Sequence, residues 1–249
     1  MKLNSANINV MVKACRKASK TLIRDFGEVE NLQVSLKGPG DFVTNCDKKI
    51  EKILIDELLK ARPSYSILSE EIGEINNDDS FKWIIDPIDG TSNFFHGIPH
   101  FAMSVGLEHN KEIICGIIYD PIKDEMFAAE KGNGSYLNNK RIRVSKKKKL
   151  EDCLFATGGI ISEKNKTDTD ITIRRSGSAA LDMAYVASGR FDGYFQKKLN
   201  LWDIAAGIII IKEAGGIINE IDLNKNSNIK IIASNNSINE KLVKNLTNF

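Results

Sequence analysis

An apolar run that ends in two acids constrains the fold more than any other feature of the sequence. Residues 83–85 are apolar, and they lead directly into the segment Asp86-Pro87-Ile88-Asp89-Gly90-Thr91. Proline fixes φ and donates no backbone hydrogen bond, so we expect a buried strand to end at Pro87, while Gly90 allows a close approach of the backbone to a ligand. Residues 91–95 then open a short helix whose free N–H groups suit a phosphate. Taken alone, the segment is also compatible with a charged turn.

The N-terminal half of the chain predicts two helices followed by strands. Apolar residues recur at helical spacing from Ile8 to Phe26, and Gly27 is a suitable C-cap. A second helix is predicted to start at Thr44, a good N-cap, and to stop before Pro63. Short strands are expected at residues 66–69 and 82–85. A strand meander is expected over residues 102–144, with turns at 109–111, 121–124, 132–134 and 138–139.

The C-terminal part alternates strands and helices, which indicates an α/β lobe. Strands are predicted at residues 154–157, 192–195 and 230–233, and helices at 178–188, 203–214 and from about 237 onward. Residues 162–170 are polar and predict a loop. We therefore place a boundary near residue 146, between an N-terminal α+β lobe (residues 1–145) and a C-terminal α/β lobe (residues 146–249).

Composition excludes several classes of protein. The chain has 249 residues, 42% of them hydrophobic, and a formal net charge of +2, so no global field favours nucleic acid or a membrane surface. The longest apolar runs, such as residues 208–211, are far too short to span a bilayer. The N-terminus lacks the apolar core of a secretory signal. Four scattered cysteines without a C-x-x-C motif predict free thiols in a reducing compartment. These features together predict a cytoplasmic protein of a size typical of an enzyme.

Further acids stand at the ends of predicted elements. Glu70 follows the strand at 66–69, Asp203 opens the apolar helix that follows Trp202, and Asp47 lies in the first turn of the second helix. Asp203 and Asp47 each have a plainer interpretation, because an acid in the first turn of a helix often only caps it or complements its dipole. Together with Asp86 and Asp89, however, they predict an all-oxygen shell of the kind that selects Mg²⁺ or Mn²⁺ over Zn²⁺.

The segments that carry these acids resemble those of a known family. Four segments carry a resemblance to the inositol monophosphatase family over about residues 6–245: the lead-in at 37–47, Ser69-Glu70-Glu71, the segment 83–94 and Leu201-Trp202-Asp203-Ile204-Ala205-Ala206-Gly207. Asn93-Phe94 with His96-Gly97-Ile98-Pro99 is most similar to the bacterial inositol-1-phosphatase type, whereas the nucleotide- and histidinol-phosphatase branches usually carry lysine in place of Ser92. The resemblance implies a layered α/β/α/β/α sandwich, an α/β fold of the inositol monophosphatase and fructose-1,6-bisphosphatase type.

The resemblance also implies a role for each acid in binding two or three Mg²⁺ ions, with Mn²⁺ as an alternative. The first ion would be held by Glu70, Asp86, Thr91 and the carbonyl of Ile88. The second would be held by Asp86, Asp89 and Asp203, and Glu70 would support a weaker third. Asp47 and Thr91 would orient the attacking water, and the backbone of Gly90 and Thr91 would hold the phosphate. A two-metal site of this kind needs no protein nucleophile.

On the substrate side, the resemblance implies that the turn Gly177-Ser178-Ala179 contacts substrate hydroxyls, although it could also be a plain helix N-cap. Seven residues before Asp203, relatives of the inositol type usually carry a glutamate that accepts hydrogen bonds from the substrate, and this chain has Gln196. His96 and His100 are not expected to form a helical metal pair, because Gly97 and Pro99 lie between them.

The implied reaction is hydrolysis of a small phosphomonoester, myo-inositol 1-phosphate in the first place, by a lithium-sensitive homodimer. Two alternatives stay open. The substrate could be fructose 1,6-bisphosphate or a nucleotide phosphate. The main role could instead be binding to the transcription machinery, as in some bacterial relatives, so a nucleic-acid context is not excluded.

Overall fold

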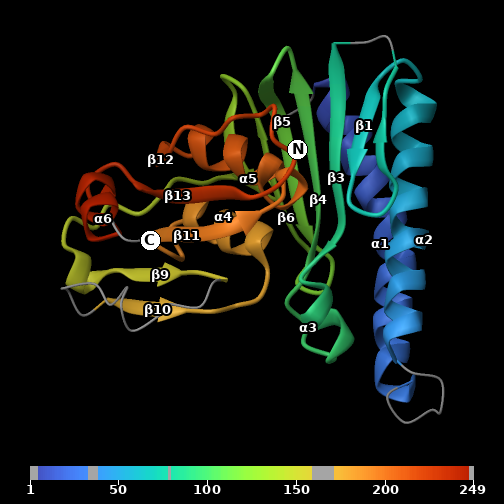
Figure 1. The fold of residues 1–249 in the computed structure, drawn as a ribbon, viewed down its shortest axis with the longest axis horizontal. Coiled ribbons are helices and arrows are strands. Elements are labelled where there is room, and N and C mark those ends of the chain that lie inside the picture. Colours follow the sequence, from blue (N-terminus) through green and yellow to red (C-terminus); the bar gives the residue numbers. More distant parts are fainter. Residues whose placement is uncertain (1–4, 33–38, 78–79, 159–170, 247–249) are drawn as a thin grey trace.

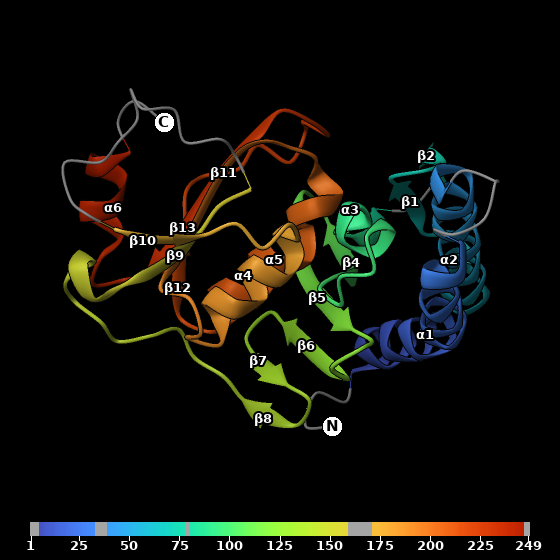
Figure 2. The same ribbon diagram turned by 90° about the horizontal axis from the view of Figure 1, so that it is seen from below.

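The computed structural model describes residues 5–32, 39–77, 80–158 and 171–246, and it arranges them in five layers (Figure 1). A pair of long helices covers one face of a large sheet, and two further helices cover its other face (Figure 2). A second sheet packs on the far side of those two helices, and a short C-terminal helix lies outside it. The predicted α/β/α/β/α layering is therefore confirmed. The α-helices of the described residues are α1 (Ala6–Leu32), α2 (Pro39–Ala61), α3 (Thr91–Phe95), α4 (Ala179–Ala187), α5 (Leu201–Glu213) and α6 (Asn239–Asn245).

The larger sheet has eight strands in the order β2-β1-β3-β4-β5-β6-β7-β8. Strands β1 and β3 run parallel, and every other neighbouring pair is antiparallel, as expected for a meander. The strands are β1 (Ser66–Ser69), β2 (Gly73–Ile75), β3 (Phe81–Asp89), β4 (Ala102–His109), β5 (Glu112–Asp120), β6 (Glu125–Glu130), β7 (Gly134–Leu137) and β8 (Lys140–Arg141).

The smaller sheet has five strands in the order β10-β9-β11-β13-β12. Strand β9 pairs in parallel with both of its neighbours, and β13 pairs antiparallel with both of its own. The chain reaches this sheet through the short 3₁₀ helix η1 (Leu150–Asp152). The strands are β9 (Leu154–Ala156), β10 (Thr172–Arg174), β11 (Gly193–Leu199), β12 (Gly216–Ile218) and β13 (Ile229–Asn235).

Three apolar cores fill the spaces between the layers. Along β3, Trp83 and Ile85 face the helix pair α1–α2, whereas Ile84 faces α4 and α5. Along β11, Tyr194 belongs to the core that contains α4 and α5, and Phe195 belongs to the outer core beneath α6. The strands are thus buried on both faces, which explains why they appear in the sequence as continuous apolar runs rather than as an alternation.

Helix α5 lies directly on the larger sheet because β5 carries a glycine beneath it. A Cβ atom at Gly116 would stand 2.7 Å from the carbonyl oxygen of Ala206 and 2.6 Å from the Ile209 side chain. No side chain larger than hydrogen fits at this position without displacing the helix. The close approach brings the start of α5, and with it Asp203, towards the sheet that carries Asp86 and Asp89.

All four cysteines are free, buried thiols. Cys15, Cys46 and Cys115 lie in the core between α1–α2 and the larger sheet, and Cys153 lies in the outer core beneath α6. The expectation of free thiols is confirmed. Within the part of the chain that the structure describes, no helix is both long enough and apolar enough to cross a membrane.

Several predicted element boundaries are wrong for physical reasons. Helix α1 does not stop at Gly27 but continues to Leu32, because Val29 is buried in the first core and its packing outweighs the low helix propensity of glycine. Helix α2 begins at Pro39 rather than at Thr44, in keeping with the preference of proline for the first helical turn. The short strands β2, β10 and β12 were not predicted. The predicted loop at 162–170 lies outside the described residues.

Strand β3 does not end at Pro87. It continues to Asp89, and its pairing with β4 shifts between Asp86, which faces Ser104, and Asp89, which faces Ala102. Two residues of β3 therefore stand opposite one residue of β4. A bulge of this kind tolerates proline, because the ladder requires no N–H from the extra residue. The bulge lies between the two acids that the sequence singles out.

Candidate active site

The end of β3 presents two buried carboxylates. Asp86 is 2% exposed and Asp89 is 7% exposed. The backbone N–H of Ile88 donates to Asp86 Oδ1 at 3.0 Å, and the hydroxyl of Thr91 donates to the Ile88 carbonyl at 2.9 Å. Gly90 follows with φ 96°, in the left-handed region, and α3 starts directly after it as predicted. The bulge and the turn together hold Asp86, Asp89 and Thr91 at one end of the larger sheet.

Asp89 connects the larger sheet to α4. Its carboxylate accepts hydrogen bonds from the Ser178 hydroxyl, from the Ala179 N–H at 3.2 Å and from the Ala180 N–H at 2.9 Å. The Ser178 hydroxyl oxygen also accepts from the N–H of Leu181 at 3.2 Å, so Ser178 is the N-cap of α4. The turn at 177–179 therefore lies against Asp89, and the plain N-cap interpretation of Ser178 also holds.

Asp203 lies in the first turn of α5. The backbone N–H of Asn200 donates to its Oδ2 at 2.7 Å, and the two residues form a capping box. The capping interpretation of Asp203 is thus correct as far as its hydrogen bonds go. Its charge nevertheless raises the pKa of Glu70, Asp86 and Asp89, so the structure brings Asp203 close to these acids.

A buried acid that the sequence analysis missed supports Glu70. Glu51, on α2, is 1% exposed, and its Oε1 accepts hydrogen bonds from the Ser69 hydroxyl, the Glu71 N–H at 3.0 Å and the Ile72 N–H at 3.3 Å. It therefore fixes the turn on both sides of Glu70. The available signal was its place four residues after Asp47, on the apolar face of the same helix.

The five predicted acids share one electrostatic environment. Burial raises the pKa of Asp47 and Asp89 to about 8, of Glu70 to about 7 and of Asp203 to about 6, and neighbouring negative charges contribute for all but Asp203. For Asp86, burial and then the charges of Asp89, Glu70 and Asp203 hold the pKa well above its usual range. Among the described residues, the main causes of these shifts include no lysine or arginine. Within the described structure, the charges that act on these five acids are therefore negative.

The oxygen ligands of this cluster fit a hard divalent ion, although the side chains as placed do not converge on a single point. Asp47 Oδ1 is buried and has no hydrogen-bond partner, and all the candidate ligands are oxygens. Within the described ranges, no three His, Cys, Asp or Glu side chains form a group that could hold a metal as they stand. The reason is visible in the contacts: Asp89 and Asp203 point one or both carboxylate oxygens at donors on α4 and α5.

Gln196 occupies the position where a substrate-binding acceptor was expected. The Tyr194 hydroxyl donates to Gln196 Oε1 at 2.6 Å, and the amide group of Gln196 lies so close to Gly158 that a Cβ there would stand 2.2 Å from Oε1. Asp182, Asp89 and Asp203 all raise the pKa of Tyr194 after burial. Tyr194, another residue that the sequence analysis missed, is therefore a hydrogen-bond partner of Gln196 that also senses the charge of the acidic cluster.

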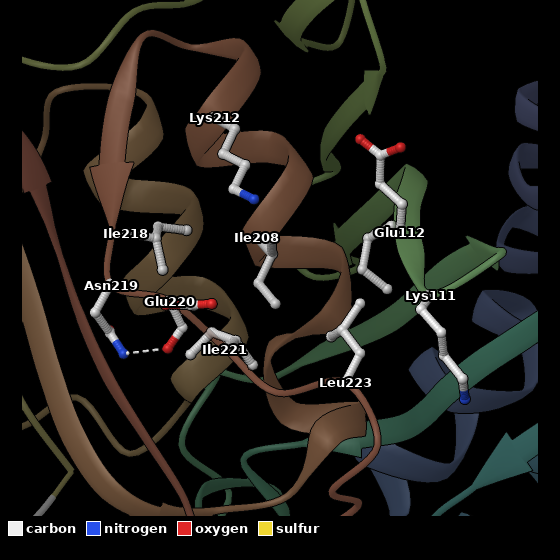
Figure 3. A pocket seen from close by; sticks show the side chains of 10 residues that line it. Lys111, Glu112, Ile208, Lys212, Ile218, Asn219, Glu220, Ile221 and Leu223 are labelled. Atoms are coloured by element: carbon white, nitrogen blue, oxygen red, sulfur yellow. Dashed lines mark hydrogen bonds between the residues drawn. The ribbon is translucent and has the colours of Figure 1, made fainter.

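A separate pocket of about 200 Å³ lies between α5, the start of β5 and the segment after β12 (Figure 3). Apolar side chains, among them Ile208, Ile218 and Ile221, line the pocket together with charged side chains such as Lys111 and Lys212. None of the predicted site residues lines it. The pocket is therefore distinct from the acidic cluster.

Comparisons with known proteins agree with the fold and the motifs. A model of the inositol monophosphatase family matches residues 4–248. The inositol-1-monophosphatase of Mesorhizobium japonicum is 46% identical over 254 residues, which cover 96% of each chain. The Nus factor SuhB of Escherichia coli strain K12 is 40% identical over 225 residues, 86% of this chain and 84% of that protein. The crystal structure of the extragenic suppressor protein suhB from Bartonella henselae superposes with a TM-score of 0.87 at 47% identity, covering 97% of this chain and 98% of that one. The chain belongs to the inositol monophosphatase family.

Proposed function

We propose that the protein is a Mg²⁺-dependent phosphatase that hydrolyses a small phosphomonoester, with myo-inositol 1-phosphate as its substrate. One observation carries the proposal: five acids from α2, the β1–β2 turn, β3 and α5 have raised pKa values, and no lysine or arginine of the described residues is among the main causes that act on them. Such a cluster is stable at neutral pH only if it is protonated or binds cations. The inositol monophosphatase family is metal-dependent, which supports the second solution.

In this proposal Glu70, Asp86, Thr91 and the Ile88 carbonyl hold one ion, and Asp86, Asp89 and Asp203 hold another, with Glu70 near a third. Bound Mg²⁺ would lower the pKa of a water, neutralise phosphate charge and stabilise the leaving alkoxide. Asp89 and Asp203 would exchange their hydrogen bonds to α4 and α5 for this role. Glu51 keeps Glu70 in place through the turn after β1.

The chain's own groups bind and orient the reactants. Asp47, whose Oδ1 has no partner within the described structure, accepts a hydrogen bond from the attacking water together with Thr91. The backbone N–H groups of Gly90 and Thr91 bind the phosphate. The turn at 177–179 and Gln196 contact the rest of the substrate. The choice of inositol 1-phosphate is supported by relatives named inositol-1-monophosphatase at 46% and 50% identity.

The test is phosphate release by the purified protein from myo-inositol 1-phosphate, fructose 1,6-bisphosphate and a nucleoside phosphate, in Mg²⁺ and in EDTA. We expect Mg²⁺-dependent release with the highest kcat/KM for inositol 1-phosphate. A higher kcat/KM for either of the other two substrates would assign that substrate instead, with the reaction unchanged. No release from any substrate would reject a catalytic role.

A second candidate function is binding to the transcription machinery. It is supported by relatives named Nus factor SuhB that are 40% identical to this chain over about 85% of its length. This role is compatible with catalysis. Retention of RNA polymerase and antitermination factors on the immobilised protein would support it, and their absence from the bound fraction at low salt would reject it.

We further propose that the protein is a cytoplasmic homodimer. Two exposed isoleucines, Ile98 (48%) and Ile122 (37%), lie in neighbouring turns that are joined by a hydrogen bond of 3.3 Å from Lys123 Nζ to the Pro99 carbonyl. Exposed apolar side chains in neighbouring turns are suited to burial at an interface. Sedimentation equilibrium measures the mass directly, and a monomer at micromolar concentration would contradict the proposal.

A further inference from the structure

Three segments that are far apart in the sequence meet at Gly90. A Cβ atom at this position would stand 3.1 Å from the His100 carbonyl oxygen, 3.2 Å from the Phe101 Cβ and 3.3 Å from the Gly177 carbonyl oxygen. The turn proposed above to bind phosphate therefore packs between the segment that precedes β4 and the turn that precedes α4. The position of the second turn relative to the first decides where a bound substrate meets Asp89.

A single side chain ties the two outer segments together. Asn93 Nδ2 donates to the His100 carbonyl at 2.7 Å and to the Ser176 carbonyl at 2.9 Å. Both hydrogens of the amide are therefore used, one for each segment. The turn has glycine at position 177 for a related reason, since a Cβ there would stand 2.8 Å from Asn93 Nδ2.

The helix that carries Asn93 is itself fixed to the first core. Phe94 is fully buried, and its ring lies 5.2 Å from the ring of Phe101 and 5.6 Å from that of Phe26. Helix α3 stands at the ends of β3 and β4 (Figure 1). Asn93 therefore extends from a rigid base on the first lobe to the main chain of the second.

The same turn has a second link to the larger sheet, which is the Asp89 carboxylate. Asp89 accepts from Ser178, Ala179 and Ala180, and in the proposed function it must release some of these bonds to a cation. The Asn93 side chain is neutral, and its Nδ2 donates to two main-chain carbonyls rather than to Asp89, so these two bonds survive that exchange. We propose that Asn93 is a positioning residue that holds residues 176–178 against Gly90 while Asp89 changes partners. The kinetic part of this inference rests on the proposed function.

The experiment compares Asn93→Ala and the nearly isosteric Asn93→Asp with Asn219→Ala. Asn219 is a matched control, because its Nδ2 also donates to two main-chain carbonyls, those of Glu220 at 3.0 Å and Lys230 at 3.1 Å, and it lines the separate pocket (Figure 3). The first readout is hydrogen exchange at the amides of residues 179–182, which bond to Asp89 and Ser178. The second is kcat and KM for inositol 1-phosphate.

In both Asn93 variants we expect exchange at residues 179–182 to accelerate by about tenfold, since two hydrogen bonds are lost, with little change elsewhere in the chain. Asn219→Ala should leave these amides unchanged. We expect kcat to fall by about 10- to 100-fold, as for misaligned reactants, and KM to change by less than about threefold because the phosphate site remains on the first lobe.

Unchanged exchange at residues 179–182 in the Asn93 variants would overturn the proposal. So would a uniform loss of protection across the chain in both variants, because Asn93 would then serve global stability. Local exchange changes in a protein whose wild type releases no phosphate would reject the proposed function and leave the positioning role standing. Normal kcat in active Asn93 variants would reject the positioning role alone.

Discussion

The Tyr194 hydroxyl donates its hydrogen bond to Gln196 Oε1 across 2.6 Å, two residues along β11. The carbonyl end of the Gln196 amide is therefore engaged within the protein, and its NH₂ group is the end best able to meet a ligand. A glutamate in this position would present acceptors only. A free NH₂ group at Gln196 favours a ligand group that accepts a hydrogen bond, such as a second phosphate, over a hydroxyl that must donate one.

The first prediction follows for substrate preference. Gln196→Glu should raise kcat/KM for myo-inositol 1-phosphate and lower it for fructose 1,6-bisphosphate, each by about fivefold, the difference between a charged and a neutral hydrogen bond. Tyr194→Phe, which frees Oε1, should shift the preference in the same direction but less. The measurement is kcat/KM for both substrates in the three proteins, and an unchanged ratio between substrates in Gln196→Glu would sink the idea.

The second prediction concerns Asp89. Asp89→Asn keeps the shape but removes a charge from the proposed second ion, and we expect kcat to fall about 100-fold or more, equivalent to about 2.7 kcal/mol. Asp120→Asn is the matched control, because Asp120 is also buried and also accepts from two backbone N–H groups and one side chain. Both variants should lose stability, but only Asp89→Asn should lose turnover at saturating Mg²⁺. Near-wild-type turnover in Asp89→Asn would show that the site is wrongly assigned.

The third prediction is a pH-dependent stabilisation by Mg²⁺. In the metal-free fold the pKa of Asp47 and Asp89 is raised to about 8, whereas an unfolded aspartate titrates near about 3.9. The folded state therefore binds more protons than the unfolded state between these values, so stability is greatest at the acid end and falls as pH rises towards 8. We expect the Tm in EDTA to fall as the pH rises from about 6 to about 8.5.

Mg²⁺ should offset this loss. At about 100 times its Kd, a bound ion adds about 2.7 kcal/mol, which is about 5–10 °C in Tm for a chain of this size. The gain should be larger at the higher pH, where protons no longer occupy the acids. Thermal melts with MgCl₂ and with NaCl at matched ionic strength measure it, and a gain that does not grow with pH would contradict the assignment.

The fourth prediction is inhibition by lithium. Li⁺ is close to Mg²⁺ in size but carries half the charge, so at Asp86, Asp89 and Asp203 it would bind without stabilising the leaving group to the same extent. Phosphate release should fall on titration with LiCl and remain steady with KCl at matched ionic strength. Equal effects of the two salts would exclude a specific lithium site.

The elements with strong local signals were predictable from the sequence. Strand β1 matches its predicted bounds. Helices α4 and α5 differ from theirs by one or two residues, because apolar runs and clear N-caps define them. The boundaries at Gly27 and Pro87 were wrong, because burial of Val29 and a bulge opposite β4 override local preference. The strands β2, β10 and β12 have three residues each, too few for a periodic signal.

Some features of the candidate site could also be predicted from the sequence, and others could not. The acids stand at element ends, and their convergence could be anticipated from the sequence, whereas their present hydrogen-bond partners could not. The contact of Asp89 with Ala180 spans 91 residues and that of Asn93 with Ser176 spans 83, and no local pattern encodes such pairs. The same holds for the support that Glu51 gives to the turn at Glu70. The roles of the individual acids as ligands stay predictions.

The rate at which the four buried thiols are alkylated would measure how often the layers of the fold open. Burial raises the pKa of Cys15 and Cys115 to about 12 and that of Cys153 to about 11, so almost none is present as the nucleophilic thiolate at neutral pH. Alkylation must therefore wait for a layer to separate. The labelling rate of Cys15 and Cys115 reports how often the long helix pair separates from the larger sheet, and that of Cys153 reports how often the C-terminal helix separates from the smaller one. The two rates therefore measure local opening at the two outer faces of the fold separately.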